Sequence, residues 1–228
     1  MINIKDIIKN KIHIGHIKSR RNPYMSKFII NVKNKVDIIN PLQFSYRLKI
    51  ISKNLTLGAS LGGKILYYGN KPIITDLIKF YSKKNNMPYI NYKWTPGLLT
   101  NIYNNTLSLM KKDIIKKQMT SNMYKYLPIR EKNKLYRKYK NINKRYLSIK
   151  NMDILPLYII ITNTNGNDLI IKEAKKMGVL IVGIVDSDSN PINIDYPIPA
   201  NDDYKGSINF ILNYLTNSIT MGLKNKIL

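Results

Sequence analysis

The feature that most constrains the fold is an alternation of apolar runs with amphipathic segments. Three runs of strand length are almost entirely apolar: KILYYG at 64–69, LYIIIT at 157–162 and VLIVGIVD at 179–186. Such runs are typical of strands buried on both faces, and amphipathic segments such as 41–55 and 167–178 supply helices to cover them. The sequence therefore predicts an α/β fold, a doubly wound parallel sheet with helices on both faces, of flavodoxin- or Rossmann-like type.

Residues 106–150 depart from this alternation. Apolar side chains recur here at intervals of three and four, in two series: Leu107, Met110, Ile114, and Leu135, Tyr139, Ile142, Tyr146, Ile149. This heptad-like spacing predicts two helices of an inserted antiparallel coiled-coil hairpin, joined near TSNMYKYLP at 120–128. We therefore expect a sheet domain formed by 1–105 and 151–228, with the hairpin at 106–150 between its halves.

Charge is distributed unevenly along the chain. Lys and Arg number 38 against 13 Asp and Glu, a formal net charge of +25. Residues 1–150 carry 32 of the basic and 5 of the acidic side chains, and residues 111–150 alone carry 14 basic and 2 acidic ones. A solvated surface does not require so one-sided a charge, so the pattern favours a polyanionic partner, in particular a nucleic acid.

The candidate RNA-binding residues are the cations of an N-terminal basic segment, of the tryptophan loop and of the hairpin. The first 40 residues are predicted to form an amphipathic turn followed by a Pro-containing basic loop with few apolar partners, and GASLGG at 58–63 is predicted to be another loop. We expect the following side chains to contact phosphate: Lys18, Arg20, Arg21, Lys27, Lys33, Lys35, Lys93, Lys111, Lys112, Lys116, Lys117, Arg137, Lys138 and Arg145.

The single tryptophan stands in NYKWTPGLLTN at 91–101. Pro96 fixes φ and Gly97 tolerates conformations closed to other residues, so the loop after Trp94 is predicted to be rigid. Asn101 or Thr100 is placed to cap the first hairpin helix. We expect Trp94 to anchor the base of the hairpin to the sheet by burial, with stacking on an RNA base as the alternative.

Four aspartates offer an enzymatic alternative. Asp186 and Asp188 follow a predicted strand, at the edge where doubly wound sheets bind ligands, and Asp202 and Asp203 follow the next one. Together they have the chemistry to hold Mg²⁺ for a nucleic-acid-processing enzyme. We favour instead a structural role, in which Asn201 or Asp202 caps the last helix and Asp186 and Asp188 form turns before Pro191.

Composition argues against several other classes of protein. There is no cysteine and there are two histidines, so we expect no disulfide, no metal centre and no cofactor. No apolar run approaches the roughly 18 residues of a membrane span, so we expect no membrane among the partners. We also expect no small-molecule substrate. The N-terminus MINIKDIIKNKIHIGH lacks the Arg- and Ser-rich character of a transit peptide.

Several segments resemble a known family in order and spacing. HIGHIKSRRNPYMSKFIINVKNKVDIINP, KILYYGNKP, INYKWTPGLLTN, IKEAKKMGVLIVGIVDSDSNP and DYPIPANDD are similar to segments of the ribosomal protein S2 family, from about residue 3 to about residue 218. The resemblance implies a doubly wound sheet with an inserted coiled-coil hairpin. It also implies a structural constituent of the small ribosomal subunit, bound to its ribosomal RNA and to neighbouring proteins, which acts in translation and is not an enzyme.

Two features of the resemblance suggest a location. Trp94-Thr-Pro-Gly97 stands where bacterial members usually have Trp-x-Gly-Gly, and the form found here is similar to archaeal, cytosolic and some mitochondrial relatives. The chain also lacks the long acidic tail of several bacterial members. With the bias toward Lys, Asn and Ile and no transit peptide, these features predict an organelle-encoded protein of an organellar ribosome, mitochondrial first, with a plastid, including a relict plastid, as the alternative.

Overall fold

The computed structural model describes residues 3–146, 152 and 154–225, without the side chains of residues 102–106 and 144–146. Its centre is a five-stranded sheet in which every pairing is parallel, with the strand order β5-β4-β6-β7-β8. The strands are β4 (Ile65–Tyr68), β5 (Tyr89–Ile90), β6 (Tyr158–Ile161), β7 (Leu180–Val185) and β8 (Tyr196–Pro199). This order, with the first core strand inside the sheet, is that of flavodoxin-like folds, and the predicted fold class is confirmed.

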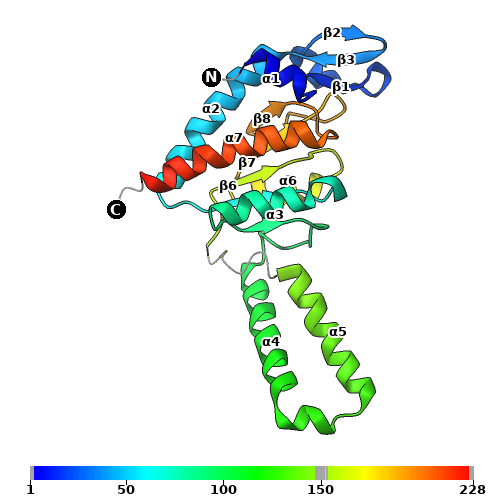
Figure 1. Ribbon diagram of the computed structural model, residues 1–228, viewed down its shortest axis with the longest axis vertical. Coiled ribbons are helices and arrows are strands. Elements are labelled where there is room, and N and C mark those ends of the chain that lie inside the picture. The colour runs from blue at the N-terminus through cyan, green and yellow to red at the C-terminus, as the bar shows by residue number, and fades with distance from the viewer. Residues whose placement is uncertain (1–2, 147–151, 153, 226–228) are drawn as a thin grey trace.

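Helices cover both faces of this sheet. α2 (Pro41–Ser60), α3 (Thr75–Lys84), which follows the short η3 (Pro72–Ile74), and α7 (Lys205–Lys224) pack on one face, with the short α1 (Ile4–Lys9) beside them (Figure 1). α6 (Asp168–Lys176) packs on the other face with the loop that holds Trp94. Successive strand residues point to opposite faces, so Tyr67 joins the first core cluster and its neighbour Tyr68 the second.

α2 is longer than predicted, because it includes the start of the glycine-rich stretch that we expected to be a loop. Gly58, Ala59 and Ser60 form its last turn. A Cβ on Gly58 would lie 2.6 Å from the Tyr158 ring, so the glycine permits close packing of the helix on β6. A glycine that permits close packing in a helix cannot be told from a loop glycine by sequence alone. For this reason the predicted loop at 58–63 was wrong at residues 58–60.

The N-terminal basic segment is a small sheet, not the loop we expected. β1 (Ile14–Ile17), β2 (Ile29–Lys33) and β3 (Val36–Ile39) form an antiparallel sheet with the order β1-β3-β2. Asn34 and Lys35, at φ of 50° and 65°, make the tight turn between β2 and β3. Two short helical turns, η1 (Lys18–Arg20) and η2 (Pro23–Phe28), complete the unit, which lies at one end of the molecule (Figure 1).

A helical hairpin projects from the opposite end (Figure 1). α4 (Ile102–Thr120) and α5 (Ile129–Tyr146) pack against each other and are joined through η4 (Asn122–Tyr126). In α5, Leu135, Tyr139 and Ile142 of the predicted seam are half-buried, whereas Ile149 lies outside the described residues. The coiled-coil character of the pair and its boundaries as an insertion stay predictions.

The predicted seam of the first hairpin helix holds at Leu107, which is half-buried, and is wrong at Met110 and Ile114. Met110 and Ile114 are 57% and 55% exposed, whereas Ile115 and Met119 are half-buried. Apolar side chains lie on more than one face of this helix. Two sets of residues therefore have helical spacing, and the sequence alone did not show which set is buried.

The hairpin contributes nothing to the described core, and this predicts the effect of its removal. Neither core cluster contains a described residue between Leu99 and Met152. Replacing residues 108–146 with a short Gly/Ser linker should therefore leave the sheet domain folded, with a melting temperature within a few degrees of that of the full chain. Thermal unfolding followed by circular dichroism measures this, and loss of the cooperative transition would show that the sheet depends on the hairpin.

Candidate nucleic-acid interface

The N-terminal sheet presents most of its predicted RNA-binding cations to solvent. The exposed members are Lys18, Arg20, Lys27, Lys33 and Lys35. Among the described residues, no ion pair involves any of these five side chains. Their charges are therefore available to an external polyanion.

Arg21 differs from its neighbours and corrects the prediction. Its guanidinium forms a two-pronged ion pair with Asp37, whose side chain is fully buried, through Nε at 2.8 Å and through Nη2. The hydrogen bonds to Asp37 raise the pKa of Arg21. A guanidinium that pairs with a buried carboxylate stabilises the sheet, so we expect Arg21 to contribute less to phosphate binding than its exposed neighbours.

The hairpin carries a second set of exposed cations. Lys111, Lys116, Lys117, Arg137 and Lys138 are exposed along α4 and α5. Lys112 is not, because its side chain is 7% exposed, with Nζ 3.7 Å from Asp113, so it was wrongly grouped with them. Arg145 belongs to α5, but its side chain lies outside the described part of the chain.

The tryptophan loop is tied to the sheet by one carboxylate. Trp94 is 6% exposed and meets Tyr68 edge to face, with ring centroids 5.6 Å apart. Its indole N–H donates to Glu173 of α6 at 3.3 Å, and the backbone N–H groups of Gly97 and Leu99 donate to the same carboxylate at 2.8 and 3.2 Å. Three donors on one buried carboxylate hold the loop rigidly against α6.

The other positions of this loop have local roles. Gly97 has a φ of +84°, a conformation that favours glycine, and Pro96 precedes it on the surface. Asn101 stands directly before α4, and its backbone N–H donates to the Gly97 carbonyl at 2.8 Å. Lys93 is exposed and lines a cavity of about 300 Å³ together with Trp94 and Asn167.

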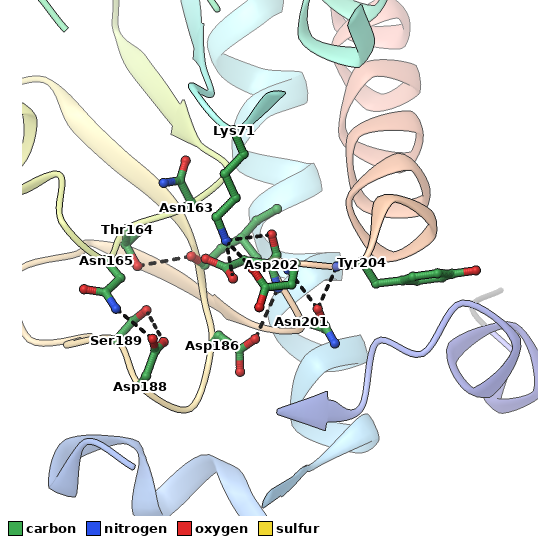
Figure 2. A network of polar contacts seen from close by, with 12 residues as sticks. Lys71, Asn163, Thr164, Asn165, Asp186, Asp188, Ser189, Asn201, Asp202 and Tyr204 are labelled. Atoms are coloured by element: carbon green, nitrogen blue, oxygen red, sulfur yellow. Dashed lines mark hydrogen bonds and ion pairs between the residues drawn. The ribbon is translucent and has the colours of Figure 1, made fainter. Parts of the chain in front are cut away.

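The four aspartates of the enzymatic alternative gather at the carboxyl edge of the parallel sheet, as their positions after two strands suggested, and Figure 2 shows Asp186, Asp188 and Asp202 of this group. They are joined there by two cations that sequence reasoning did not assign to the group. Lys71, just after β4, places Nζ 2.8 Å from Asp202 and 2.7 Å from Asp203. His16 of β1 places Nε2 3.2 Å from Asp203 and Nδ1 3.3 Å from Asp186.

His16 is the charged centre of this carboxylate cluster, which comprises Asp186, Asp188, Asp202 and Asp203. Contact with Asp186, outweighing partial burial, raises the pKa of His16 to about 9, and Asp188 and Asp203 add to the effect. Nδ1 is near Asp186 without the alignment of a hydrogen bond, so the contact is an ion pair. A protonated His16 and Lys71 thus offset much of the negative charge of the group.

The two buried carboxylates of the cluster make different contacts. Burial raises the pKa of Asp202 to about 6, although Lys71 opposes this shift. Asp186, whose side chain is 1% exposed, accepts from the backbone N–H of Ser187 at 2.5 Å and of Asp202 at 3.3 Å. Asp186 thus binds the backbone of two neighbouring loops, the one after β7 and the one after β8.

Backbone contacts join the N-terminal sheet to the same edge. The N–H of His16 donates to Ser187 Oγ and the N–H of Asn22 to the Ser187 carbonyl, both at 2.8 Å. The Asn201 side chain donates to the Ile14 carbonyl at 2.7 Å. A Cβ on Gly15 would lie 2.9 Å from Ser187 Oγ, so β1 approaches this edge as closely as glycine allows. The cluster is thus an attachment between two sheets.

The caps expected before the last helix are not formed. α7 begins at Lys205, after Tyr204, and has no side-chain cap. Asp202 is drawn into the ion pair with Lys71 instead, which the sequence did not indicate. Asn201 forms a turn ahead of the helix, its side-chain oxygen accepting from the N–H groups of Asp203 and Tyr204, both at 2.9 Å (Figure 2).

The turn expected at Asp186 and Asp188 is formed, because the backbone N–H of Ser189 donates to the Asp186 carbonyl at 3.1 Å, and the Asp188 side chain makes further contacts. The Asp188 carboxylate accepts from the side chain of Asn165 at 2.7 Å and from the hydroxyl of Ser189 at 3.1 Å (Figure 2).

The described residues hold no group of three or more His, Cys, Asp or Glu side chains arranged to bind a metal ion. Within the same residues, no helix combines the length and the apolar character needed to cross a membrane.

Comparison with known proteins settles the family. The model of the family described as ribosomal protein S2 matches residues 7–222. The chain belongs to the ribosomal protein S2 family. It is 37% identical over 219 residues to the small ribosomal subunit protein uS2 of Karelsulcia muelleri, covering 96% of this chain and 99% of the relative. It is 30% identical over 225 residues to uS2 of Salinibacter ruber, covering 99% of this chain and 70% of that protein.

Membership of the S2 family confirms the resemblance drawn from the quoted segments. Two of those segments, HIGH at 13–16 and IPANDD at 198–203, supply His16, Asp202 and Asp203 of the carboxylate cluster. These two segments are far apart in the sequence of this S2-family chain but are in direct contact in the fold, through His16 with Asp203 and Asn201 with Ile14.

The raised pKa of His16 predicts a pH-dependent stability. A group whose pKa rises from 6.5 to about 9 on folding stabilises the fold fully below pH 6.5, and the stabilisation is lost as the pH rises through about 9. Allowing for solvent screening of the partly exposed ring, the free energy of unfolding should fall by about 1–2 kcal/mol across this window. Chemical denaturation at several pH values measures the fall.

His16→Gln should flatten the stability profile between pH 6.5 and 9, whereas the matched variant His13→Gln should keep its slope. Equal slopes in the wild-type protein and the His16 variant would show that His16 is not the titrating group.

Proposed function

We propose that this protein is a structural constituent of the small ribosomal subunit, which acts in translation by binding ribosomal RNA. The observation that carries the proposal is the family match over residues 7–222, together with relatives named small ribosomal subunit protein uS2. The uneven charge supports it, since 32 of 38 basic side chains fall in the first 150 residues.

The N-terminal sheet and the hairpin are the proposed RNA-binding surfaces. The residues proposed to contact phosphate are Lys18, Arg20, Lys27, Lys33, Lys35, Lys93, Lys111, Lys116, Lys117, Arg137 and Lys138, all exposed. The two surfaces lie at opposite ends of the molecule (Figure 1), so one protein would contact RNA segments that are far apart. Phosphate contacts of this kind fix position and orientation without reading sequence.

The partners in this proposal are the RNA and the neighbouring proteins of the subunit. The proposal includes no cofactor, metal ion, membrane or small-molecule substrate. An organellar ribosome, mitochondrial before plastid, stays a prediction from composition. The relatives named above are bacterial, and an AT-rich bacterial genome would produce the same bias toward Lys, Asn and Ile.

The alternative of a Mg²⁺-dependent nucleic-acid enzyme is not supported. Asp186, Asp202 and Asp203 do converge with Asp188, but their contacts are with His16, Lys71 and backbone N–H groups that join two sheets. A structural role accounts for each of these contacts. The proposal therefore assigns no catalytic step to the protein.

Arg21 and its exposed neighbours should respond differently to substitution. Lys18→Ala with Arg20→Ala should weaken binding to small-subunit ribosomal RNA and flatten the dependence of log K on log salt concentration by about 0.7–0.9 for each lost phosphate contact. Arg21→Ala should leave the salt slope unchanged and lower the melting temperature, because it leaves the buried Asp37 unpaired. Filter binding at several salt concentrations measures the slope.

An unchanged slope in the folded Lys18/Arg20 variant would remove these residues from the interface. A flatter slope in Arg21→Ala, at full thermal stability, would return Arg21 to it.

A further inference from the structure

The solvent-facing side of α2 is unusually apolar. One face of this helix is buried in the core, through residues such as Phe44, Leu48 and Leu55. The opposite face is also mostly apolar, and its members are well exposed: Leu42 at 68%, Tyr46 at 67%, Ile50 at 38%, Leu57 at 63% and, directly after the helix, Leu61 at 73%. A helix apolar on both faces is usually covered on both, and a continuous apolar patch on a surface marks an interaction site.

These five residues lie along one side of α2, with the exposed Lys53 between Ile50 and Leu57, and we call them the α2 stripe. Their spacing keeps them within about 100° of the helix circumference, and the stripe extends for roughly 28 Å along the axis at 1.5 Å per residue. Figure 1 shows α2 on the outside of the molecule, beside α7. A stripe of this length matches the contact surface of a second helix packed alongside.

A hollow beside the stripe supplies a place for an anchoring side chain. Tyr46, Arg47, Ile50 and Ile51 of α2 and Tyr196 of the edge strand β8 line a cavity of about 260 Å³. Its wall is aromatic and aliphatic on most sides, with one guanidinium. Such a site accepts an apolar or aromatic side chain that has a carboxylate nearby.

Three cations, Arg47, Lys49 and Lys53, lie on α2 within or beside the stripe. Lys49 and Lys53 are exposed on the same side of α2, and the Arg47 guanidinium lies 4.7 Å from the centre of the Phe28 ring. Among the described residues, no ion pair involves any of these three cations. Partial burial lowers the pKa of Arg47, a cost that a carboxylate placed beside it would offset.

The stripe and its charges discriminate between possible occupants. RNA presents phosphates and would pair with the lysines, but it would leave Leu42, Leu57 and Leu61 against a hydrated backbone. A second copy of this chain would bring the same cations face to face and adds a net charge of +25. An amphipathic helix with carboxylates along the edge of its apolar face would bury the leucines and form ion pairs with the cations.

We propose that the α2 stripe is the docking surface for an amphipathic, acid-edged helix of a neighbouring protein in the small subunit. The inference rests on the proposed function, because the partner is sought within the assembled particle. It goes beyond that function by separating a protein-binding face, α2 with β8, from the RNA-binding N-terminal sheet and hairpin.

Photo-crosslinking in intact particles tests the proposal. Tyr46 is replaced by p-benzoylphenylalanine, which keeps an aromatic ring at the mouth of the hollow, and Leu57 is replaced likewise in a second variant. Small subunits that contain the tagged protein are isolated, irradiated and analysed by mass spectrometry. We expect crosslinks from both positions to one helical segment of one neighbouring protein, rich in Leu or aromatic residues and in Asp or Glu.

A charge reversal adds a quantitative readout. Lys49→Glu with Lys53→Glu should lower the crosslink yield from position 46 roughly three- to tenfold, the effect of losing two surface ion pairs. Lys79→Glu with Lys83→Glu is the matched control, because these exposed lysines have the same spacing on α3, and it should leave the yield unchanged.

The outcomes separate this inference from the proposed function. Failure of the wild-type protein to sediment with small subunits refutes the proposed function itself. Normal sedimentation with crosslinks only to RNA, only to a second copy of this chain, or to nothing refutes the docking surface alone. Loss of sedimentation by folded crosslinker variants, with wild-type incorporation intact, supports the stripe as a binding face.

Discussion

The contact between Asp186 and the N-terminal sheet is the interaction on which the arrangement of the molecule depends. Asp186 stands at the end of β7, buried, with His16 on one side and the backbone of Asp202 on another. Ser187, next along the chain, accepts hydrogen bonds from His16 and Asn22. A parallel sheet has loops of many chain segments at its carboxyl edge, and here these loops bind another part of the same chain.

This arrangement explains how a chain of such positive charge keeps the cations of its proposed RNA-binding surfaces unpaired. The acidic side chains at the carboxyl edge are paired with His16 and Lys71, and Asp37 is paired with Arg21. Each of these pairs is internal and holds elements in position. The remaining cations of the N-terminal sheet point to solvent, where they can meet phosphate.

Much of the fold could be predicted from the sequence, because the runs at β4, β6 and β7 are apolar on both faces and nothing else in the chain competes with that pattern. The N-terminal sheet was missed, although IINVKNKVDII has the alternation of a hairpin, because Asn-Lys replaces the more familiar Asn-Gly turn and the lysines suggested a loop. The positions of Lys71 and Glu173 could not be predicted, since their partners lie 131 and 76 residues or so away in sequence. Asp202 was assigned to a cap because a cap is a local signal, and its actual partner is distant.

Amide hydrogen exchange in Asp186→Asn, compared with the wild-type protein, tests the central claim that the carboxyl edge holds the N-terminal sheet. The account predicts exchange at least about tenfold faster in residues 14–39, since losing the charge partner of His16 weakens the attachment by more than about 1.4 kcal/mol, while β6 and β7 keep their protection. Asp188→Asn, at a more exposed position, should have a smaller effect. Unchanged protection of residues 14–39 in Asp186→Asn, or equal loss throughout the parallel sheet, would contradict the account.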